Sequence, residues 1–182
     1  TNPLDGERVA GSVGFPLPGV GLRIGGGEDA GVIEIRGPSV FSGYWRMPEK
    51  TAEEFTADGW FITGDVGRVD PDGRVCISGR AKDLIISGGY NVYPKEVELV
   101  LDELAGVEES AVIGAPHPDF GEAVVAVIAG QGEEAAVIAA AREKLAGCKA
   151  PKRVVVVQEL PRNTMGKVQK NLLRDEHKQL FA

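Results

Sequence analysis

The residue of this chain best suited to chemistry is Lys167, which lies in the segment 160–167 near the C-terminus. Pro161 and Gly166 disfavour a helical interior, and the Arg-Asn-Thr run between them favours a turn. The segment therefore predicts an exposed loop that presents the lysine ammonium to an anionic group. It is not a Walker phosphate-binding loop, because that motif needs Gly at the position of Pro161 and Ser or Thr at that of Val168.

A second candidate is Asp65 in the run Thr63-Gly64-Asp65, which follows the apolar residues 60–62. This position predicts an acid at the end of a strand, with open backbone around it. A carboxylate there can accept hydrogen bonds from both hydroxyls of a ribose. The same residue type also caps turns, and from this motif alone turn capping is the better interpretation.

The charged run Gly79-Arg80-Ala81-Lys82-Asp83 lies between two apolar segments. It is either a surface cluster of ion pairs or a hinge from which Arg80 reaches a nucleotide. The next run, 87–91, contains Gly88 and Gly89, which fit a tight turn or the close approach of a ligand to the backbone. Neither motif decides alone between its two interpretations.

The histidines and cysteines exclude several kinds of site. Only His117 and His177 are present, so a histidine-based metal centre or catalytic triad has no support, and we expect no metal ligands in this chain. Cys76 and Cys148 lack metal or redox spacing. They are therefore predicted to be buried, reduced thiols and not a disulfide.

The net charge of −7 argues against a nucleic-acid partner, but the charge is unevenly distributed. From Lys149 onward, eight Lys and Arg residues stand against three acids. This basic tail is either a solvated helix face or an anion site for phosphates, and charge alone favours the first. Apolar runs such as 154–157 are far too short to span a bilayer, and the N-terminus lacks an export signal. We therefore expect a cytoplasmic protein without a membrane partner.

Residues 1–80 predict short antiparallel strands of a barrel or sandwich, because they are rich in Gly and Pro and contain alternating runs. The predicted strands span 20–24, 32–35, 60–62 and 74–77. Residues 48–55 predict one short helix. The sequence Asp-Pro-Asp-Gly at 70–73 predicts a hairpin turn.

From residue 81 the pattern changes to that of a small α+β domain. Strands are predicted at 84–86, 107–114, 123–129 and 154–157, and helices after Pro94, at 133–146 and from 168 to about 180. The predicted fold class is therefore α+β. We expect the domain boundary at 80–83.

Four motifs occur in a definite order: Thr-Gly-Asp at 63–65, Gly-Arg-x-Lys-Asp at 79–83, Ser-Gly-Gly-Tyr-Asn at 87–91 and Pro-x-x-x-x-Gly-Lys at 161–167. This order resembles that of the adenylate-forming (AMP-binding) enzymes, which include acyl-CoA synthetases, the adenylation domains of peptide synthetases and luciferases. The resemblance covers the whole chain. Within the family, the segments 43–51, 93–98 and 161–170 are most similar to bacterial malonyl-CoA synthetases, and related short-chain and aromatic acyl-CoA ligases remain open.

The resemblance implies a reaction in two steps: a carboxylate and ATP give an acyl-adenylate and pyrophosphate, and the CoA thiol then displaces AMP. It places Asp65 and Arg80 on the ribose. Lys167 would lie between the carboxylate and the α-phosphate, where negative charge builds in the transition state. Lys82 falls on the family's hinge position, about which the small domain swings between the two steps.

For the second step, the resemblance implies a CoA site on the small domain. Gly89 would border the pantetheine tunnel, where a side chain obstructs the thiol, and Glu96 would support this glycine loop. Phe120 would meet the CoA nucleotide by stacking and Lys149 by charge. The implied CoA-binding residues are Gly88, Gly89, Tyr90, Phe120 and Lys149.

The resemblance also implies the domain organisation. Residues 1–80 would be the last subdomain of the large AMP-binding domain, a fragment of a distorted antiparallel β-barrel. Residues 81–182 would be the mobile small domain, with a β-hairpin, a three-stranded sheet and helices. The family's phosphate loop, its motif for Mg²⁺ and adenylate, and its acyl pocket lie upstream of these motifs and are not found in the sequence.

The chain is therefore expected to be a C-terminal portion that is inactive alone and has the N-terminal remainder of the same polypeptide as its partner. The whole enzyme would use ATP, CoA, Mg²⁺ and a small carboxylic acid, malonate or a close analogue. Two alternatives stay open. One is an adenylation domain that loads a carrier protein, and the other is a noncatalytic module that binds nucleotide or a partner protein.

Overall fold

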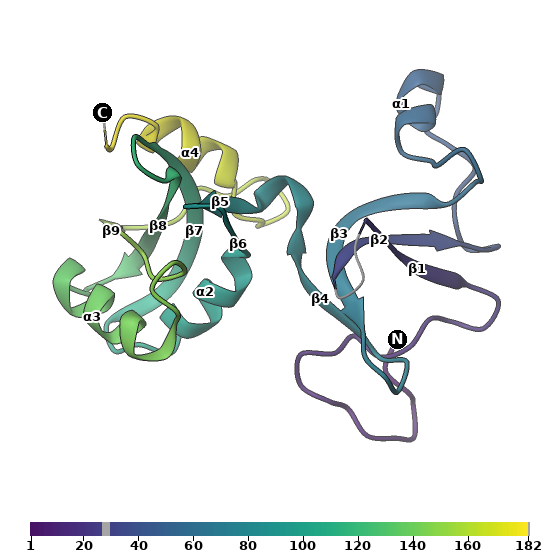
Figure 1. Ribbon diagram of the computed structural model, residues 1–182, viewed down its shortest axis with the longest axis horizontal. Coiled ribbons are helices and arrows are strands. Elements are labelled where there is room, and N and C mark those ends of the chain that lie inside the picture. The colour runs from purple at the N-terminus through teal and green to yellow at the C-terminus, as the bar shows by residue number, and fades with distance from the viewer. Residues whose placement is uncertain (27–29, 182) are drawn as a thin grey trace. The chain divides into compact units, whose positions relative to one another are not determined.

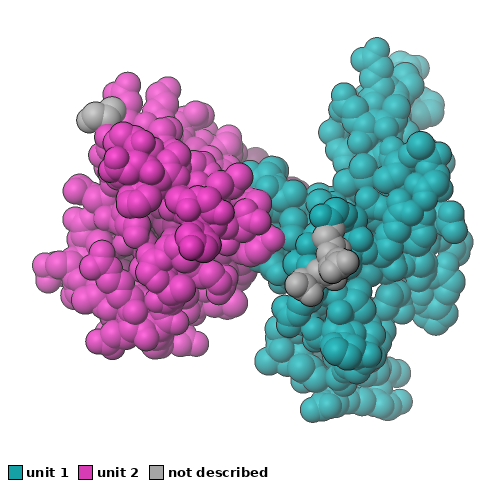
Figure 2. Space-filling model, in the orientation of Figure 1, with its two compact units in different colours: residues 1–82 teal, residues 83–182 magenta. Residues whose placement is uncertain are grey.

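A computed structural model of the protein describes residues 1–26 and 30–181, and the chain divides into two compact units, Thr1–Lys82 and Asp83–Ala182 (Figure 2). The division falls within the segment 80–83 that separates the two patterns of the sequence. Within the described residues, no helix combines the length and the apolar character needed to cross a membrane. We describe each unit by itself.

The first unit is built on a four-stranded antiparallel sheet in the order β1-β2-β3-β4 (Figure 1). Its strands are β1 (Gly21–Gly25), β2 (Gly31–Arg36), β3 (Phe61–Val69) and β4 (Val75–Arg80). β3 and β4 extend well beyond the predicted segments 60–62 and 74–77. They are joined by the predicted turn, in which the Gly73 amide donates to the Asp70 carbonyl at 2.8 Å.

The one helix of the described part of this unit is α1 (Pro48–Glu53), which begins at a proline in its first turn. Proline is favourable there because its fixed φ suits a helix and its missing N–H is not needed. Lys50 pairs with Glu54, one turn further along, at 2.5 Å. The helix therefore has local sequence reasons to form, as residues 48–55 predicted.

The second unit contains β5 (Ile85–Ser87), β6 (Tyr90–Val92), β7 (Val107–His117), β8 (Gly121–Gly130) and β9 (Arg153–Val157). The sheet order is β6-β5-β8-β7, and β9 pairs with β8 in parallel. The predicted hairpin (β5, β6) and three-stranded sheet (β7, β8, β9) are both present. They form one sheet, because Ser87 pairs with Gly121 at the start of β8.

Three helices cover this sheet: α2 (Pro94–Leu101), α3 (Glu134–Lys144) and α4 (Lys170–His177). α2 and α3 pack on one face, where they bury Val97, Leu101 and Val137 against alternate residues of β8. α4 buries Leu173 on the opposite face (Figure 1). β8 is an unbroken apolar run because both of its faces are covered. The α+β fold class is confirmed.

Candidate functional site

The loop that carries Lys167 is a closed turn organised by Asn163. The side-chain carbonyl oxygen of Asn163 accepts hydrogen bonds from the amides of Met165 at 3.0 Å and Lys167 at 2.9 Å. Its backbone amide donates to the Lys167 carbonyl at 2.9 Å. Gly166 lies at φ +77°, where glycine is favoured, and completes the turn. The loop is exposed as predicted, and these bonds also hold it in a defined conformation.

Both arms of this loop, the residues before and after the turn, are held in place by further contacts. The amide of Gln169 donates to the Pro161 carbonyl at 2.8 Å, which brings the two ends together. The Arg162 guanidinium donates to the Gly166 carbonyl and pairs with Glu109 of β7. The tip of the turn is therefore fixed relative to β7, and the conformation of the loop does not depend on the Lys167 side chain.

Lys167 itself is exposed, and within residues 1–26 and 30–181 no carboxylate lies within ion-pair distance of its ammonium. Two other lysines of the basic tail differ in this respect, since Lys149 pairs with Glu96 and Lys170 with Glu98. The Lys167 ammonium is thus free to meet an external anion.

Asp65 and Arg80 lie directly opposite each other on β3 and β4. The Arg80 Nε forms an ion pair with Asp65 Oδ1 at 2.9 Å, and the same guanidinium donates a hydrogen bond to the Thr63 carbonyl at 3.1 Å. Asp65 was expected at a strand end, which is wrong, since β3 continues to Val69. The reason is that the cross-strand partner Arg80 satisfies the acid, so the ladder has no need to stop at a polar residue.

The carboxylate of Asp65 borders a hollow of about 240 Å³ on the first unit, lined mostly by apolar side chains. Leu22, Ile33 and Ile77 are among these residues. The structure therefore brings the two predicted ribose contacts together, beside a surface that could accept an apolar ring.

Gly88 and Gly89 form the turn between β5 and β6, at φ +58° and +81°. Positive φ at both central residues is typical of a two-residue hairpin turn, so the turn alone explains the glycine pair. A side chain on Gly88 would meet the Phe120 ring at 3.6 Å, whereas one on Gly89 would have no described atom within 4 Å. Gly89 thus leaves open space beside the turn, and Tyr90 next to it is 63% exposed.

Phe120 is brought next to this turn, because its carbonyl accepts a hydrogen bond from the Gly88 amide at 2.9 Å. The Lys152 ammonium lies 5.5 Å from the centre of the Phe120 ring. Sequence analysis did not single out Lys152, although it belongs to the basic tail. The half-exposed ring and the cation together form a surface on which a planar anionic group could bind.

Glu96 does not hold the glycine turn as expected. Its carboxylate accepts a hydrogen bond from Lys149 at 2.6 Å, and its backbone amide donates to the Tyr93 carbonyl. The resemblance alone implied that Glu96 supports this loop. The helix α2 instead directs this side chain toward the segment that precedes β9.

Lys82 is exposed and is the last residue of the first unit, within the short 3₁₀ turn Ala81–Asp83. The next residue along the chain, Asp83, pairs with Arg174 of α4 at 2.7 Å. In the part of the chain that the structure describes, no three His, Cys, Asp or Glu side chains converge as a metal site would require.

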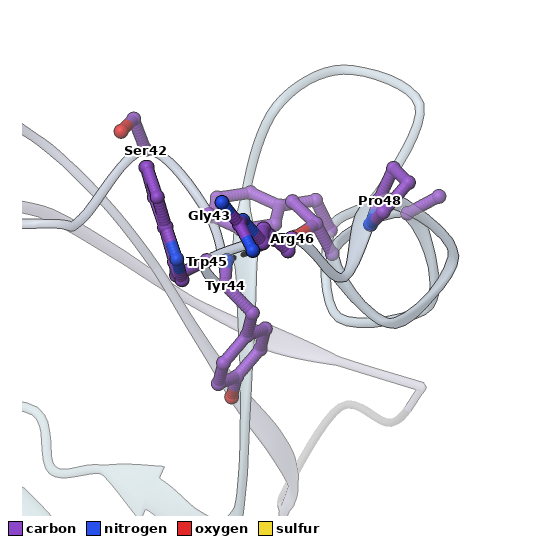
Figure 3. A pocket seen from close by; sticks show the side chains of 9 residues that line it. Ser42, Gly43, Tyr44, Trp45, Arg46 and Pro48 are labelled. Carbon is purple, nitrogen blue, oxygen red and sulfur yellow. Dashed lines mark hydrogen bonds between the residues drawn. The ribbon is translucent and has the colours of Figure 1, made fainter.

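The sequence did not point to a cavity of about 520 Å³ around the loop before α1, which Figure 3 shows. Tyr44, Trp45 and Arg46 line it, and Arg46 has the left-handed φ of +56°. The Arg46 guanidinium lies over the Trp45 ring, 5.5 Å from the centre of the ring, and Trp45 is 84% exposed. The one available signal was the Gly-Tyr-Trp-Arg run at 43–46.

Residues 96–167 match the family model of the AMP-binding enzyme C-terminal domain. A (7a-methyl-1,5-dioxo-octahydro-1H-inden-4-yl)propanoyl:CoA ligase of Rhodococcus jostii (strain RHA1) is 49% identical over 178 residues, which cover 96% of this chain and 34% of the ligase. Malonate–CoA ligase of Arabidopsis thaliana is 43% identical over 193 residues, which cover 96% of this chain and 32% of that protein. The crystal structure of ATP-bound MatB from Rhodopseudomonas palustris is 53% identical, with a TM-score of 0.92, and covers 100% of this chain and 38% of that chain.

The chain belongs to the AMP-binding, adenylate-forming enzymes. The resemblance drawn from the four motifs is thus confirmed, and the matching structure confirms the α+β fold. These relatives are CoA ligases, which join an acid to a thiol, so they are acid-thiol ligases. The chain spans about a third of the length of the curated relatives it matches.

Proposed function

We propose that these residues are the C-terminal portion of an ATP-dependent acyl-CoA synthetase, in which Lys167 stabilises the transition state of adenylate formation. The observation that carries the proposal is the exposed ammonium of Lys167 on a hydrogen-bonded turn, together with membership of a family of CoA ligases. In this reaction a carboxylate oxygen attacks the α-phosphorus of ATP, and pyrophosphate leaves. Lys167 would stabilise the negative charge that develops between the two groups, as a compact point charge can.

Asp65 and Arg80 would hold the ribose of ATP. The pair supports this role because the ion pair with Arg80 engages one oxygen of the Asp65 carboxylate and so fixes the orientation of the other oxygen. A carboxylate held in this way can accept hydrogen bonds from the two ribose hydroxyls. The apolar hollow beside it offers a surface for the base. The first unit would in this way bind the nucleoside, and Lys167 of the second unit would act on its phosphate.

CoA would bind to the second unit during the next step, in which the thiol sulfur attacks the acyl carbon and AMP leaves. The open space at Gly89 is compatible with a narrow pantetheine chain that passes close to the backbone. Phe120 would stack on the adenine of CoA. Lys149 would pair with a CoA phosphate, in exchange for the carboxylate of Glu96 that it holds in this structure.

We further propose that the units correspond to the end of the large domain (1–80) and to the mobile small domain (81–182), with Lys82 as the hinge. The division of the chain at Lys82 and the 3₁₀ turn around it support this assignment. The two steps need different groups, Lys167 for the first and Gly89 for the second. A swinging second unit would bring each to the same reacting carboxyl group in turn.

The acid is proposed to be malonate or a close analogue, because malonate–CoA ligase is among the similar proteins, at 43% identity. A ligase of a different and larger acid is 49% identical, so similarity alone does not fix the acid. Because the resemblance places the Mg²⁺ motif upstream of these residues, Mg²⁺ would be held outside them, and these 182 residues alone would be inactive.

The proposal is tested by the two half-reactions of the complete polypeptide. With malonate and ATP, Lys167→Ala should lower pyrophosphate release by about 100-fold or more, the usual effect of removing a group that stabilises a transition state. Formation of the thioester from a supplied acyl-adenylate and CoA should change little. The control Lys144→Ala, at an exposed ion pair of the same unit, should leave both rates unchanged. Full adenylation by Lys167→Ala would contradict the proposal.

The same preparation separates the alternative functions. If a phosphopantetheinyl carrier protein and not CoA accepts the acyl group, the enzyme loads a carrier. Absence of carboxylate-dependent pyrophosphate release with malonate, acetate and benzoate would favour the noncatalytic module.

A further inference from the structure

A buried ion pair lies close to Lys167 along the chain. Glu98 of α2 is 6% exposed, and its Oε1 accepts hydrogen bonds from the Lys170 ammonium at 2.5 Å and from the Val112 amide at 2.9 Å. A carboxylate removed from water costs free energy unless its oxygens are paired. These two bonds, together with the Lys95 ammonium 4.0 Å from Oε2, compensate for the burial of Glu98.

The pair also crosses the edge of the second unit's sheet. Among the described strands, β7 pairs with β8 and has no partner on its other side, so half of its amides point away from the sheet. The Glu98 carboxylate accepts a hydrogen bond from one of these amides, that of Val112. α2 covers one face of the sheet and α4 the other (Figure 1). One carboxylate therefore connects α2, the edge strand and α4.

The place of Lys170 is not explained by the helix that it begins. It is the first residue of α4, whose N-cap residue makes no side-chain hydrogen bond and whose first turn contains no acid. A positive charge at a helix N-terminus is unfavourable, because the helix dipole is positive there. The ion pair with Glu98 supplies the reason for a lysine at this position.

Lys170 follows Lys167 by three residues and continues directly from the second arm of its loop. The first arm is attached to β7 through Arg162 and Glu109, and the second through Lys170 and Glu98. If the second attachment were lost, the bond between Gln169 and Pro161 would still join the two arms. The Arg162–Glu109 ion pair would then be the one remaining ion pair between the loop and β7 among the described residues, and the turn could tilt about it. The ammonium at its tip would then lose its fixed position.

We propose that Glu98 and Lys170 are positioning residues for the adenylation step, acting through Lys167. The inference rests on the proposed function and extends it to two residues that touch neither ATP nor the acid. A displacement of about 1 Å at a reacting centre can cost about 100-fold in rate. Loss of the pair should therefore slow adenylation and spare thioester formation, in which Lys167 has no part.

The test uses the complete polypeptide with malonate, or with acetate or benzoate if the wild type adenylates one of these faster. Lys170→Met should lower the kcat of pyrophosphate release by roughly 10- to 100-fold, with a small change in the KM for ATP. Thioester formation from the supplied acyl-adenylate should stay within about twofold, and Lys170→Arg, which keeps the charge, should restore adenylation. Hydrogen exchange of the amides at 163–167 should become faster in Lys170→Met.

The matched control is Lys144→Met, because Lys144 pairs with Glu103 at 3.0 Å on the exposed surface of the same unit. It should change neither half-reaction. If Lys170→Met does not fold, Glu98→Gln replaces it, since an amide of the same shape can still bond to Val112 and Lys170 while the charge is lost. This variant should lower adenylation by about 10-fold and spare the second step.

An equal loss in both half-reactions would mean that the pair only stabilises the unit, and would overturn the inference. So would unchanged adenylation in both Lys170→Met and Glu98→Gln while Lys167→Ala has lost it, and the proposed function would then stand. If Lys167→Ala retains adenylation, or the wild type adenylates none of the three acids, the proposed function itself fails and this inference with it.

Discussion

The side chains of the candidate site differ in how their charges are balanced. Asp65 and Arg80 neutralise each other, as do Glu96 and Lys149, so a ligand at either place must enter an existing ion pair. Lys167 is exposed without such a partner among the residues described. The ammonium of Lys167, proposed to act in the reaction, is therefore available to an anion. The charged groups proposed to bind the ligands are already oriented by their ion-pair partners.

The two cysteines provide a test of residue environments that does not depend on the proposed function. Burial raises the pKa of the Cys76 thiol, and the neighbouring Asp70 carboxylate, 3.3 Å from its sulfur, raises it further. Cys148 is only half-buried. Because the thiolate is the nucleophile, iodoacetamide at pH 8 should alkylate Cys148 at least about 10-fold faster than Cys76 in the folded protein.

Peptide mass spectrometry over a time course measures this ratio. The urea-unfolded chain is the control, in which both thiols should react at similar rates. Equal rates in the folded protein would show that the thiol of Cys76 is more accessible than in this structure.

At the scale of elements, the sequence predicted the order of strands and helices better than their ends. Runs such as 123–129 are apolar throughout and could be placed as buried strands. β3, however, continues through Thr63-Gly64-Asp65, because the partner that allows a polar residue in mid-strand is Arg80 on another strand. Such a pairing depends on the register of two strands, which sequence spacing does not reveal.

The two acids Glu96 and Glu98 of α2 also show that contacts between elements cannot be read from sequence spacing. The resemblance implied a role for Glu96, and no motif pointed to Glu98. A usable signal existed, because Pro94, Glu98 and Leu101 recur at helical spacing on the buried face of α2. What the sequence could not show was that an unpaired amide of β7 and the ammonium of Lys170 would meet the carboxylate there.

The hairpin turn of β5 and β6 yields a prediction at the element scale. Gly89→Ala and Gly89→Leu should each destabilise the second unit by about 1–2 kcal/mol, because both place a β-carbon at a positive φ. If the CoA thiol passes over Gly89, the leucine variant alone should lose most thioester formation while it retains pyrophosphate release. Thermal unfolding and the two half-reaction assays measure these effects. Equal losses in the two assays, or equal thioester losses in both variants, would refute a thiol path at this turn.

At the scale of the whole molecule, the two units each have their own sheet. The proposed ribose contacts, Asp65 and Arg80, lie in the first unit, whereas Lys167 and Gly89, proposed for the two steps, both lie in the second. The Asp83–Arg174 ion pair attaches the start of the second unit to α4, directly after the Lys167 loop. If the second unit swings, the loop therefore moves with it as one body. The segment that absorbs the motion is then confined to the residues before Asp83.

This confinement predicts where the complete polypeptide is first cut by a small amount of trypsin. Cleavage requires local opening of the backbone, and a hinge opens more readily than hydrogen-bonded structure. The first C-terminal product should begin at Asp83, after the exposed Lys82, and not at Val168, because the turn around Lys167 is closed by the bonds of Asn163. Intact-mass spectrometry identifies the product.

Lys82→Gln should remove this cut, whereas Lys144→Gln should leave it. Early cleavage after Lys167 with residues 80–83 intact would place the flexible segment in the loop and remove the physical basis for a hinge at Lys82.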